Sequence, residues 1–337
     1  MPSPRDAGFS DAEAGIIDAV RRRRGAGVTV KNFSAATLGG SNRTLLFDVV
    51  EGATTERWVS RQETYTLPNS PFLPPEHQYQ LLELAHAAHV PVPRPIFAFT
   101  DDDGLGRGYV VAAVAGETLP KAILSSAALA GARARFAHQS GEILALTHQI
   151  AVADAAFLEA KPDSVDPIAG QLERYEQYGE PHPAVDLAIA WLREHQREVA
   201  ERVVLHGDYR NGNVIVDGSG IAAVLDWECA FIGDPMADLG WLCLRSWRFG
   251  NDAKAVGGIG ERDALYEAYE QASGRAVDHQ AVRWWEIFGF VRWIVLNIMQ
   301  SNGHITGARR SPAFAACGRN VCLIEYDMLK TIAGEFE

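Results

Sequence analysis

The sequence is poor in cysteine, and it has neither a long apolar run nor an excess of basic residues. Its four cysteines form no CxxC pair and have no histidine at metal-ligand spacing, which excludes a disulfide framework and a zinc finger. No apolar segment approaches the ~20 residues that cross a bilayer, and the first residues, MPSPRDAGFSDAEAG, are polar. We therefore expect a cytoplasmic protein with reduced cysteines and no membrane partner.

The charge balance is acidic. Asp and Glu number 43 against 31 Lys and Arg, so the formal net charge is −12. Such a chain repels a phosphate backbone, and we expect no nucleic-acid partner. The basic run Arg21 to Arg24 stands at the predicted end of a helix and before Gly25, where cations and glycine favour helix termination.

The pattern of the chain changes near residue 115. Residues 28–115 carry short runs typical of strands, such as VTVKNF, TLLFDVV and GYVVAAV, and one helical stretch at 76–89. Helical periodicity dominates residues 116–337, with helices predicted at 128–150, 183–198, 262–273, 278–300 and 312–332. We predict an α+β, bilobal enzyme with a small β-rich N-lobe (28–115) and a larger, mainly helical C-lobe (116–337).

A leading helix within residues 1–27 precedes the N-lobe. Ser10 and Glu13 have the spacing of a capping box, and apolar residues then recur at helical spacing up to Val20. This pattern predicts that the helix begins at Ser10.

The stretch VVLHGDYRNGNVIVDGSGIAAVLDWE carries the chemistry. Asp208 and Asn213 lie in a polar loop between two apolar runs, and Asp226 ends the next predicted strand. Two carboxylates and an amide around one cavity suit Mg²⁺, which keeps water and substrate phosphates as its remaining ligands. Phosphoryl transfer needs such a metal and a base for the acceptor hydroxyl.

These residues carry a resemblance to a known family. HGDYRNGN resembles the HxDxxxxN catalytic loop of protein-kinase-like folds, and LDWE stands where protein kinases have DFG. Gly207 follows the histidine, as is usual in small-molecule phosphotransferases, and DWECAFIGDPMADLGWL extends the match. The chain therefore resembles the aminoglycoside phosphotransferase and choline kinase-like family from about Thr37 onward, with its closest likeness to the branch associated with acyl-CoA dehydrogenases.

The resemblance implies a Mg²⁺-dependent enzyme that transfers the γ-phosphoryl group of ATP or GTP to a hydroxyl of a small molecule. It implies that Asp208 is the catalytic base and that Asn213 and Asp226 hold the metal. His206 and Asp238 are expected to support the catalytic loop, while Arg210 is expected either to touch a phosphate or to pair with a neighbouring carboxylate.

In the N-lobe, LGGSNRTLLFDV resembles the loop that covers the nucleotide phosphates. Its glycines allow backbone amides to approach an anion, although most Gly-Gly pairs are plain hairpin turns. The residues predicted to contact the nucleotide through this loop are Gly39, Gly40, Ser41 and Asn42.

Two further nucleotide contacts are predicted in the N-lobe. Arg61 stands where protein kinases have a phosphate-anchoring Lys, and its partner on the following helix is either Glu76 or Gln78. The hinge segment GYVVAAVAGETL is expected to bond the adenine through its backbone, at Ala112, Ala113 and Val114.

The acceptor pocket is expected in the C-lobe, where two stretches are rich in Trp and Arg. They offer only Glu286 as a carboxylate, which disfavours a polycationic acceptor. We interpret Arg245, Trp247, Arg292 and Trp293 as acceptor-binding residues for an apolar molecule with an anionic end, such as a hydroxyacyl-CoA. Three alternatives stay open: these Trp residues belong to the core, the acceptor is an aminoglycoside or a choline-like amino alcohol, or the chain is a nucleotide-binding pseudokinase.

Overall fold

The chain divides into two compact units. The structure is a computed structural model that describes residues 4–36, 42–64 and 70–336. Unit 1 comprises Met1–Ala115 together with Ala223–Cys229, and unit 2 comprises Gly116–Ala222 together with Ala230–Glu337. The segment that carries Asp226 therefore belongs to unit 1, whereas the predicted boundaries assign it to the C-lobe.

Unit 1 is built on an antiparallel five-stranded sheet with the order β1-β2-β3-β5-β4. Buried Leu45, Phe47 and Val49 alternate with less buried residues along β2, because successive side chains of a strand point to opposite faces. The strands are β1 (Thr29–Ala35), β2 (Asn42–Glu51), β3 (Thr54–Glu63), β4 (Pro95–Ala98) and β5 (Gly108–Ala112).

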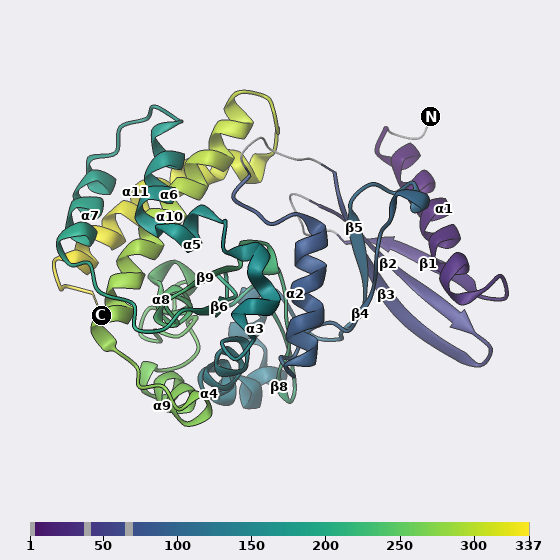
Figure 1. Cartoon of the computed structure of the whole chain (residues 1–337), viewed down its shortest axis with the longest axis horizontal. Coiled ribbons are helices and arrows are strands. Elements are labelled where there is room, and N and C mark those ends of the chain that lie inside the picture. The colour runs from purple at the N-terminus through teal and green to yellow at the C-terminus, as the bar shows by residue number, and fades with distance from the viewer. Residues whose placement is uncertain (1–3, 37–41, 65–69, 337) are drawn as a thin grey trace. The chain divides into compact units, whose positions relative to one another are not determined.

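Helix α1 (Pro4–Arg24) shares the hydrophobic core of this sheet (Figure 1). Its buried residues Ile16, Ala19 and Val20 belong to one cluster with Phe47 and Trp58. The helix begins at Pro4, so the prediction that Ser10 caps it is wrong. Proline is favoured in the first turn because its missing N–H would have no partner there, and the helix therefore starts before the capping-box pattern.

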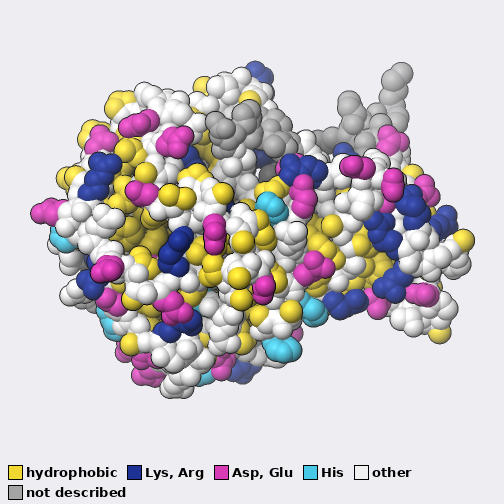
Figure 2. Space-filling model, viewed as in Figure 1, with side chains coloured by type: hydrophobic (Ala, Val, Ile, Leu, Met, Phe, Trp, Pro, Cys, Tyr) yellow, Lys and Arg dark blue, Asp and Glu magenta, His cyan; other side chains and the backbone are white. Residues whose placement is uncertain are grey.

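The basic run at the end of α1 is paired within unit 1. Arg22 and Arg23 form salt bridges with buried Asp103, and the Arg24 guanidinium lies 5.5 Å from the centre of the Trp58 ring. In Figure 2 the basic side chains of this unit lie beside acidic ones. The run ends the helix as predicted.

The other elements of unit 1 flank the sheet. Helix α2 contacts β4 and β5, and Leu81 and Ala85 on its inner face are fully buried. These elements are α2 (Pro75–Ala87) and the short 3₁₀ helices η1 (Asp101–Asp103) and η4 (Trp227–Cys229).

Unit 2 is mainly helical, and its long helices lie close to the predicted ranges. The sequence pattern did not predict the short helices α3, α5, α6 and α8. The helices are α3 (Pro120–Ser125), η2 (Ala127–Leu129), α4 (Ala130–Thr147), η3 (Val152–Leu158), α5 (Pro162–Val165), α6 (Pro167–Glu176), α7 (Pro183–Glu194), α8 (Met236–Cys243), η5 (Arg245–Trp247), α9 (Arg262–Ser273), α10 (His279–Ile305) and α11 (Pro312–Ile332).

Four short strands of this part of the chain frame the catalytic segment. Strand β6 (Val203–Leu205) pairs antiparallel with β9 (Phe231–Gly233), and β7 (Val214–Asp217) forms a second two-stranded sheet with β8 (Gly220–Val224). The loop between β6 and β7 carries the HGDYRNGN motif.

Helix α10 is the centre of unit 2 and contacts α6, α7, α8 and α11. It approaches α8 closely at Gly240, where an added Cβ would lie 2.9 Å from Trp285 Cβ. Within the described ranges, no single helix is long and apolar enough to span a membrane. Only the pair Ala127–Thr147 and Val152–Leu158, bent by 89°, reaches that length and composition together.

Candidate active site

The catalytic loop leaves β6 through a glycine in a left-handed conformation. Gly207 has a φ of 75°, which a residue with a Cβ adopts only at a cost. The preceding His206 is completely buried, and its Nδ1 accepts a hydrogen bond from the Asp208 amide at 3.1 Å. His206 therefore contacts the loop backbone next to Asp208, and its supporting role stays a prediction.

Asp208 is held by three side chains of unit 2. Its Oδ1 accepts hydrogen bonds from Trp241 Nε1 at 2.8 Å and from Arg210 Nε at 3.1 Å. Its Oδ2 accepts a hydrogen bond from Asn213 Nδ2 at 2.5 Å, and the same nitrogen donates to the Asp208 carbonyl at 3.0 Å. The structure thus brings Asp208, Asn213 and Arg210 together, and it adds Trp241, a contact that sequence spacing did not reveal.

The Asp238 side chain binds backbone amides of the catalytic loop. Its carboxylate accepts hydrogen bonds from the amides of His206 and Gly207, both at 2.8 Å, and lies 3.3 Å from His148 Nε2. Burial, the largest influence, works to raise the pKa of Asp238, but the hydrogen bonds from His148 and from the Gly207 amide outweigh it and lower that pKa. The ionised carboxylate of Asp238 therefore holds the first two residues of the loop in place.

Asp238→Asn is expected to destabilise unit 2, because the amide offers one acceptor oxygen where two buried N–H groups need partners. An unsatisfied buried donor costs about 1 to 3 kcal/mol. Since folding lowers the pKa of this carboxyl, its contribution is present above the unfolded value of about 4 and is lost as the pH falls below it. Calorimetry between pH 3 and 8 should show a smaller gap between variant and wild type at low pH. A gap independent of pH would contradict this account.

In unit 1, Asp226 adopts a strained backbone conformation beside Arg61. Its φ is 60°, a region that non-glycine residues seldom occupy and that occurs at functional sites. The two side chains form a salt bridge. Burial, the strongest influence, works to lower the pKa of Arg61, but Asp226, Tyr109 and Glu228 raise it overall, so the guanidinium remains charged.

The predicted partners of Arg61 are bound elsewhere. Glu76 accepts hydrogen bonds from Arg107 Nε and Nη2, both at 3.0 Å, and Gln78 donates to the Leu73 carbonyl at 2.7 Å. Pairing of Arg61 with Glu76 or Gln78 is therefore not what the structure shows. Glu76 lies at the start of α2, where Arg107 from the turn before β5 reaches it.

The predicted adenine and phosphate contacts are only partly described. Gly39, Gly40 and Ser41 lie outside the described residues, and Asn42 begins β2. At the hinge, the Ala112 amide donates to Arg94 O at 2.9 Å and the Ala113 amide to Arg57 O at 2.8 Å. Among the described residues, Val114 is the predicted hinge position whose amide makes no such backbone bond.

The predicted acceptor residues of unit 2 fall into two groups. Trp247 packs against Trp293 with ring centres 4.9 Å apart and the rings tilted by 55°, and the Arg210 guanidinium lies 4.5 Å from the Trp247 ring centre, so these rings lie beside the catalytic loop. Arg245 is instead paired with Asp252 and Asp327.

Arg292 differs most from its prediction. It is 6% exposed, donates to the Gly207 carbonyl at 2.5 Å and lies 4.8 Å from the Trp241 ring centre. Direct recognition of an anionic acceptor does not agree with these contacts, because the guanidinium is buried under the loop.

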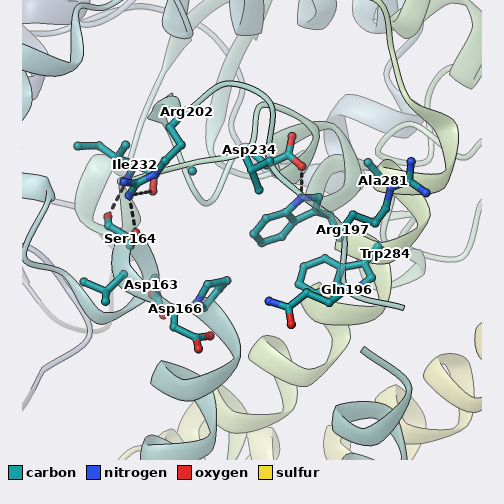
Figure 3. Close-up of a pocket in the computed structure, with 15 residues that line it drawn as sticks. Asp163, Ser164, Asp166, Gln196, Arg197, Arg202, Ile232, Asp234, Ala281 and Trp284 are labelled. Atoms are coloured by element: carbon teal, nitrogen blue, oxygen red, sulfur yellow. Dashed lines mark hydrogen bonds between the residues drawn. The ribbon is translucent and has the colours of Figure 1, made fainter. Parts of the chain in front are cut away.

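A cavity of about 320 Å³ opens elsewhere in unit 2 (Figure 3). Asp163 and Ser164 lie on one side of it, and Arg197 and Trp284 on the other. Trp284 and Trp285 are 7% and 6% exposed and donate their indole N–H groups to Leu192 O and Asp234 Oδ2. These two tryptophans are therefore core residues that also line a cavity, as expected if the tryptophans of this stretch belong to the core.

The donors predicted for Mg²⁺ fit that ion chemically. Asp226 supplies a carboxylate, and Asn213, whose amide nitrogen binds Asp208, retains its amide oxygen as a ligand. Within the described part of the chain, no group of three or more His, Cys, Asp and Glu side chains is placed to hold a metal. The chemistry of the two oxygen donors suits a metal that takes most of its ligands from nucleotide phosphates and water.

The small antiparallel sheet of unit 1, the helical unit 2 and the HGDYRNGN loop that Asp238 holds are those of a phosphotransferase of protein-kinase-like fold. The chain belongs to the phosphotransferase enzyme family, whose model matches residues 33–285. The predicted fold class, family and enzyme class, a kinase acting on an alcohol group of a small molecule, are confirmed.

Individual relatives agree with this assignment. A candidate aminoglycoside phosphotransferase of Ralstonia eutropha JMP134 superposes with a TM-score of 0.71 at 22% identity, covering 96% of this chain and 98% of that one. The aminoglycoside phosphotransferase APH(4)-Ia, solved with AMP-PNP and hygromycin B, gives a TM-score of 0.63 at 15% identity, covering 95% and 98%.

The chain is also similar to one segment of a longer protein. Over 192 residues, 52% of this chain, it is 27% identical to acyl-CoA dehydrogenase family member 10 of Mus musculus. The match covers 18% of that relative, so it spans less than a fifth of the relative's length. This likeness matches the branch predicted from the sequence.

Proposed function

We propose that the enzyme transfers the γ-phosphoryl group of ATP or GTP to a hydroxyl of a hydroxyacyl-CoA or a similar apolar, anionic metabolite, with Mg²⁺ as its cofactor. The observation that supports the reaction type most directly is the hydrogen-bonded unit of Asp208 and Asn213. A pseudokinase has no need to keep this pair and the loop anchor Asp238 together.

Asp208 acts as the base in this proposal. Its carboxylate orients the acceptor hydroxyl and takes its proton as the hydroxyl oxygen attacks the γ-phosphorus. Asn213 and Trp241 hold the carboxylate, and His206 and Asp238 hold the loop that carries it. These bonds restrict the motion of the base before the acceptor arrives, which lowers the entropic part of the barrier.

Residues of unit 1 bind the nucleotide in this proposal. Arg61 can exchange its bond with Asp226 for a phosphate oxygen, since its guanidinium presents a fork of donors. Asp226 and Asn213 would hold Mg²⁺, which neutralises charge on the phosphate oxygens when it is bound. Val114, together with the predicted loop residues Gly39 to Asn42, supplies backbone contacts.

The surroundings of Asp208 favour an apolar acceptor. In unit 2 the Trp241 indole bonds to Asp208, and Trp247 and Trp293 continue this group of rings. A polycationic acceptor would call for carboxylates, whereas the charged side chain that stacks on Trp247 is Arg210. The likeness to a segment of an acyl-CoA dehydrogenase family member supports an acyl substrate.

A turnover screen tests the substrate class. Purified protein with Mg-ATP or Mg-GTP is offered hydroxyacyl-CoAs of short and long chain, choline, ethanolamine and hygromycin B, and nucleoside diphosphate release is measured. We expect turnover to rise with the hydroxyacyl-CoAs and to disappear in Asp208→Ala. Efficient turnover of choline or hygromycin B instead would overturn the acyl proposal and leave the reaction type intact.

A further inference from the structure

The two oxygens of the Asp208 carboxylate accept different numbers of hydrogen bonds. A carboxylate offers about four lone-pair positions, two on each oxygen. Oδ1 accepts two hydrogen bonds, from Trp241 Nε1 and Arg210 Nε, whereas Oδ2 accepts one, from Asn213 Nδ2. Oδ1 is therefore saturated, and Oδ2 retains one position for another donor.

The Trp241 indole is itself held in place from several sides. It is 4% exposed and stands on α8, the helix that also carries Asp238. The guanidinium of Arg292 lies 4.8 Å from the indole ring centre and donates to the Gly207 carbonyl, one residue before Asp208. On another side the Trp247 ring centre lies 5.3 Å away.

These contacts make the indole a rigid donor. The same buried guanidinium contacts both the indole and the loop, so Trp241 Nε1 and the Asp208 backbone share one support. The cation over the aromatic face resists rotation of the indole, and the hydrogen bond from Arg292 to the Gly207 carbonyl holds that cation in place. The packing of Arg292 and Trp247 around the indole thus directs its N–H at Oδ1.

We propose that Trp241 is a positioning residue for phosphoryl transfer and that Oδ2 of Asp208 is the atom that receives the acceptor proton. This inference rests on the proposed function, because it requires Asp208 to be the base. The acceptor O–H bond breaks as its proton passes to Oδ2, the acceptor oxygen bonds to the γ-phosphorus, and the bond from that phosphorus to the β–γ bridging oxygen breaks. The nucleoside diphosphate leaves with the electron pair of that bond.

Trp241→Phe tests the positioning role, because it removes the N–H and keeps most of the ring. We expect kcat to fall about tenfold to a hundredfold, as misplacement of a reacting group does, while the KM for Mg-ATP stays within about twofold. Trp284→Phe is the matched control. Trp284 lies on α10 and donates its buried indole N–H to the Leu192 carbonyl, so its replacement removes a similar bond elsewhere and should leave kcat unchanged. An unchanged kcat in Trp241→Phe overturns the proposal.

The double variant separates positioning from general damage to the fold. In an Asp208→Ala background, Trp241→Phe should change the residual turnover by less than about twofold, since the indole then has no base to position. A loss as large as in the wild type would show that Trp241 acts on the scaffold alone and would overturn the proposal. Wild-type turnover in Asp208→Ala itself would instead refute the proposed function.

A spectroscopic measurement needs no acceptor. In ¹⁵N-labelled protein, the indole N–H signal missing from Trp241→Phe identifies Trp241 among the eight tryptophans. In Asp208→Ala this signal should move upfield, because it loses a charged acceptor, while the Trp284 signal should remain. An unmoved Trp241 signal would show that the hydrogen bond is absent and would overturn the proposal.

Discussion

Asp208→Ala is expected to lower kcat by a factor of about 10² to 10⁴, the usual effect of removing a general base. In the proposed reaction the carboxylate receives the acceptor proton, and the nucleotide needs no bond to it. The Kd for Mg-ATP, measured by calorimetry, should therefore stay close to the wild-type value. Asn213 and Trp241 each lose an acceptor in this variant, so its melting temperature is measured alongside.

Asp186→Ala is the matched control for this prediction. Asp186 is an exposed aspartate of unit 2, in the first turn of α7, and its removal should leave kcat unchanged. Wild-type kcat in a folded Asp208→Ala would remove Asp208 from the role of base.

Asp226→Asn is expected to weaken binding of the Mg-nucleotide complex about tenfold or more, equivalent to ~1.4 kcal/mol, because the proposed metal ligand changes from a charged carboxylate to a neutral amide. Binding of the nucleotide without Mg²⁺ should be unchanged or tighter, since the substitution removes a negative charge and frees Arg61 from its salt bridge. Calorimetric titrations with and without Mg²⁺ measure both effects.

Raised Mg²⁺ concentration should recover part of the lost turnover in Asp226→Asn. Asp102→Asn, an exposed aspartate of unit 1, serves as the control and should bind the nucleotide as the wild type does. If the variant and the wild type require the same Mg²⁺ concentration, Asp226 does not ligate the metal.

Local sequence patterns predicted the main elements because each pattern has a direct physical cause. Alternating apolar residues predicted strands such as β2, and helical periodicity predicted α9 at 262–273 and α11 at 312–332. The pattern failed for α5 and α6, which are short and begin at prolines within polar sequence. Such helices depend on packing more than on their own periodicity.

The ion pairs could not be predicted in the same way. Sequence spacing suggested Glu76 or Gln78 as the partner of Arg61, but Asp226 is 165 residues distant along the chain. Which carboxylate pairs with a given arginine depends on how the segments pack. Glu76 pairs with Arg107 and not with Arg61, because the turn before β5 places Arg107 beside it. Long-range charge pairing is therefore a property of the tertiary structure.

The sequence by itself determined the family and the reaction class, and it predicted Asp208 as the base, because the chemistry needs particular residue types at short, local spacings in HGDYRNGN and LDWE. Only the tertiary structure decided what supports that base. Trp241 lies 33 residues after Asp208 and Arg292 lies 85 residues after Gly207, yet both contact the catalytic loop. Their sequence context is that of ordinary core residues, since burial gives a supporting tryptophan and a core tryptophan the same apolar neighbours.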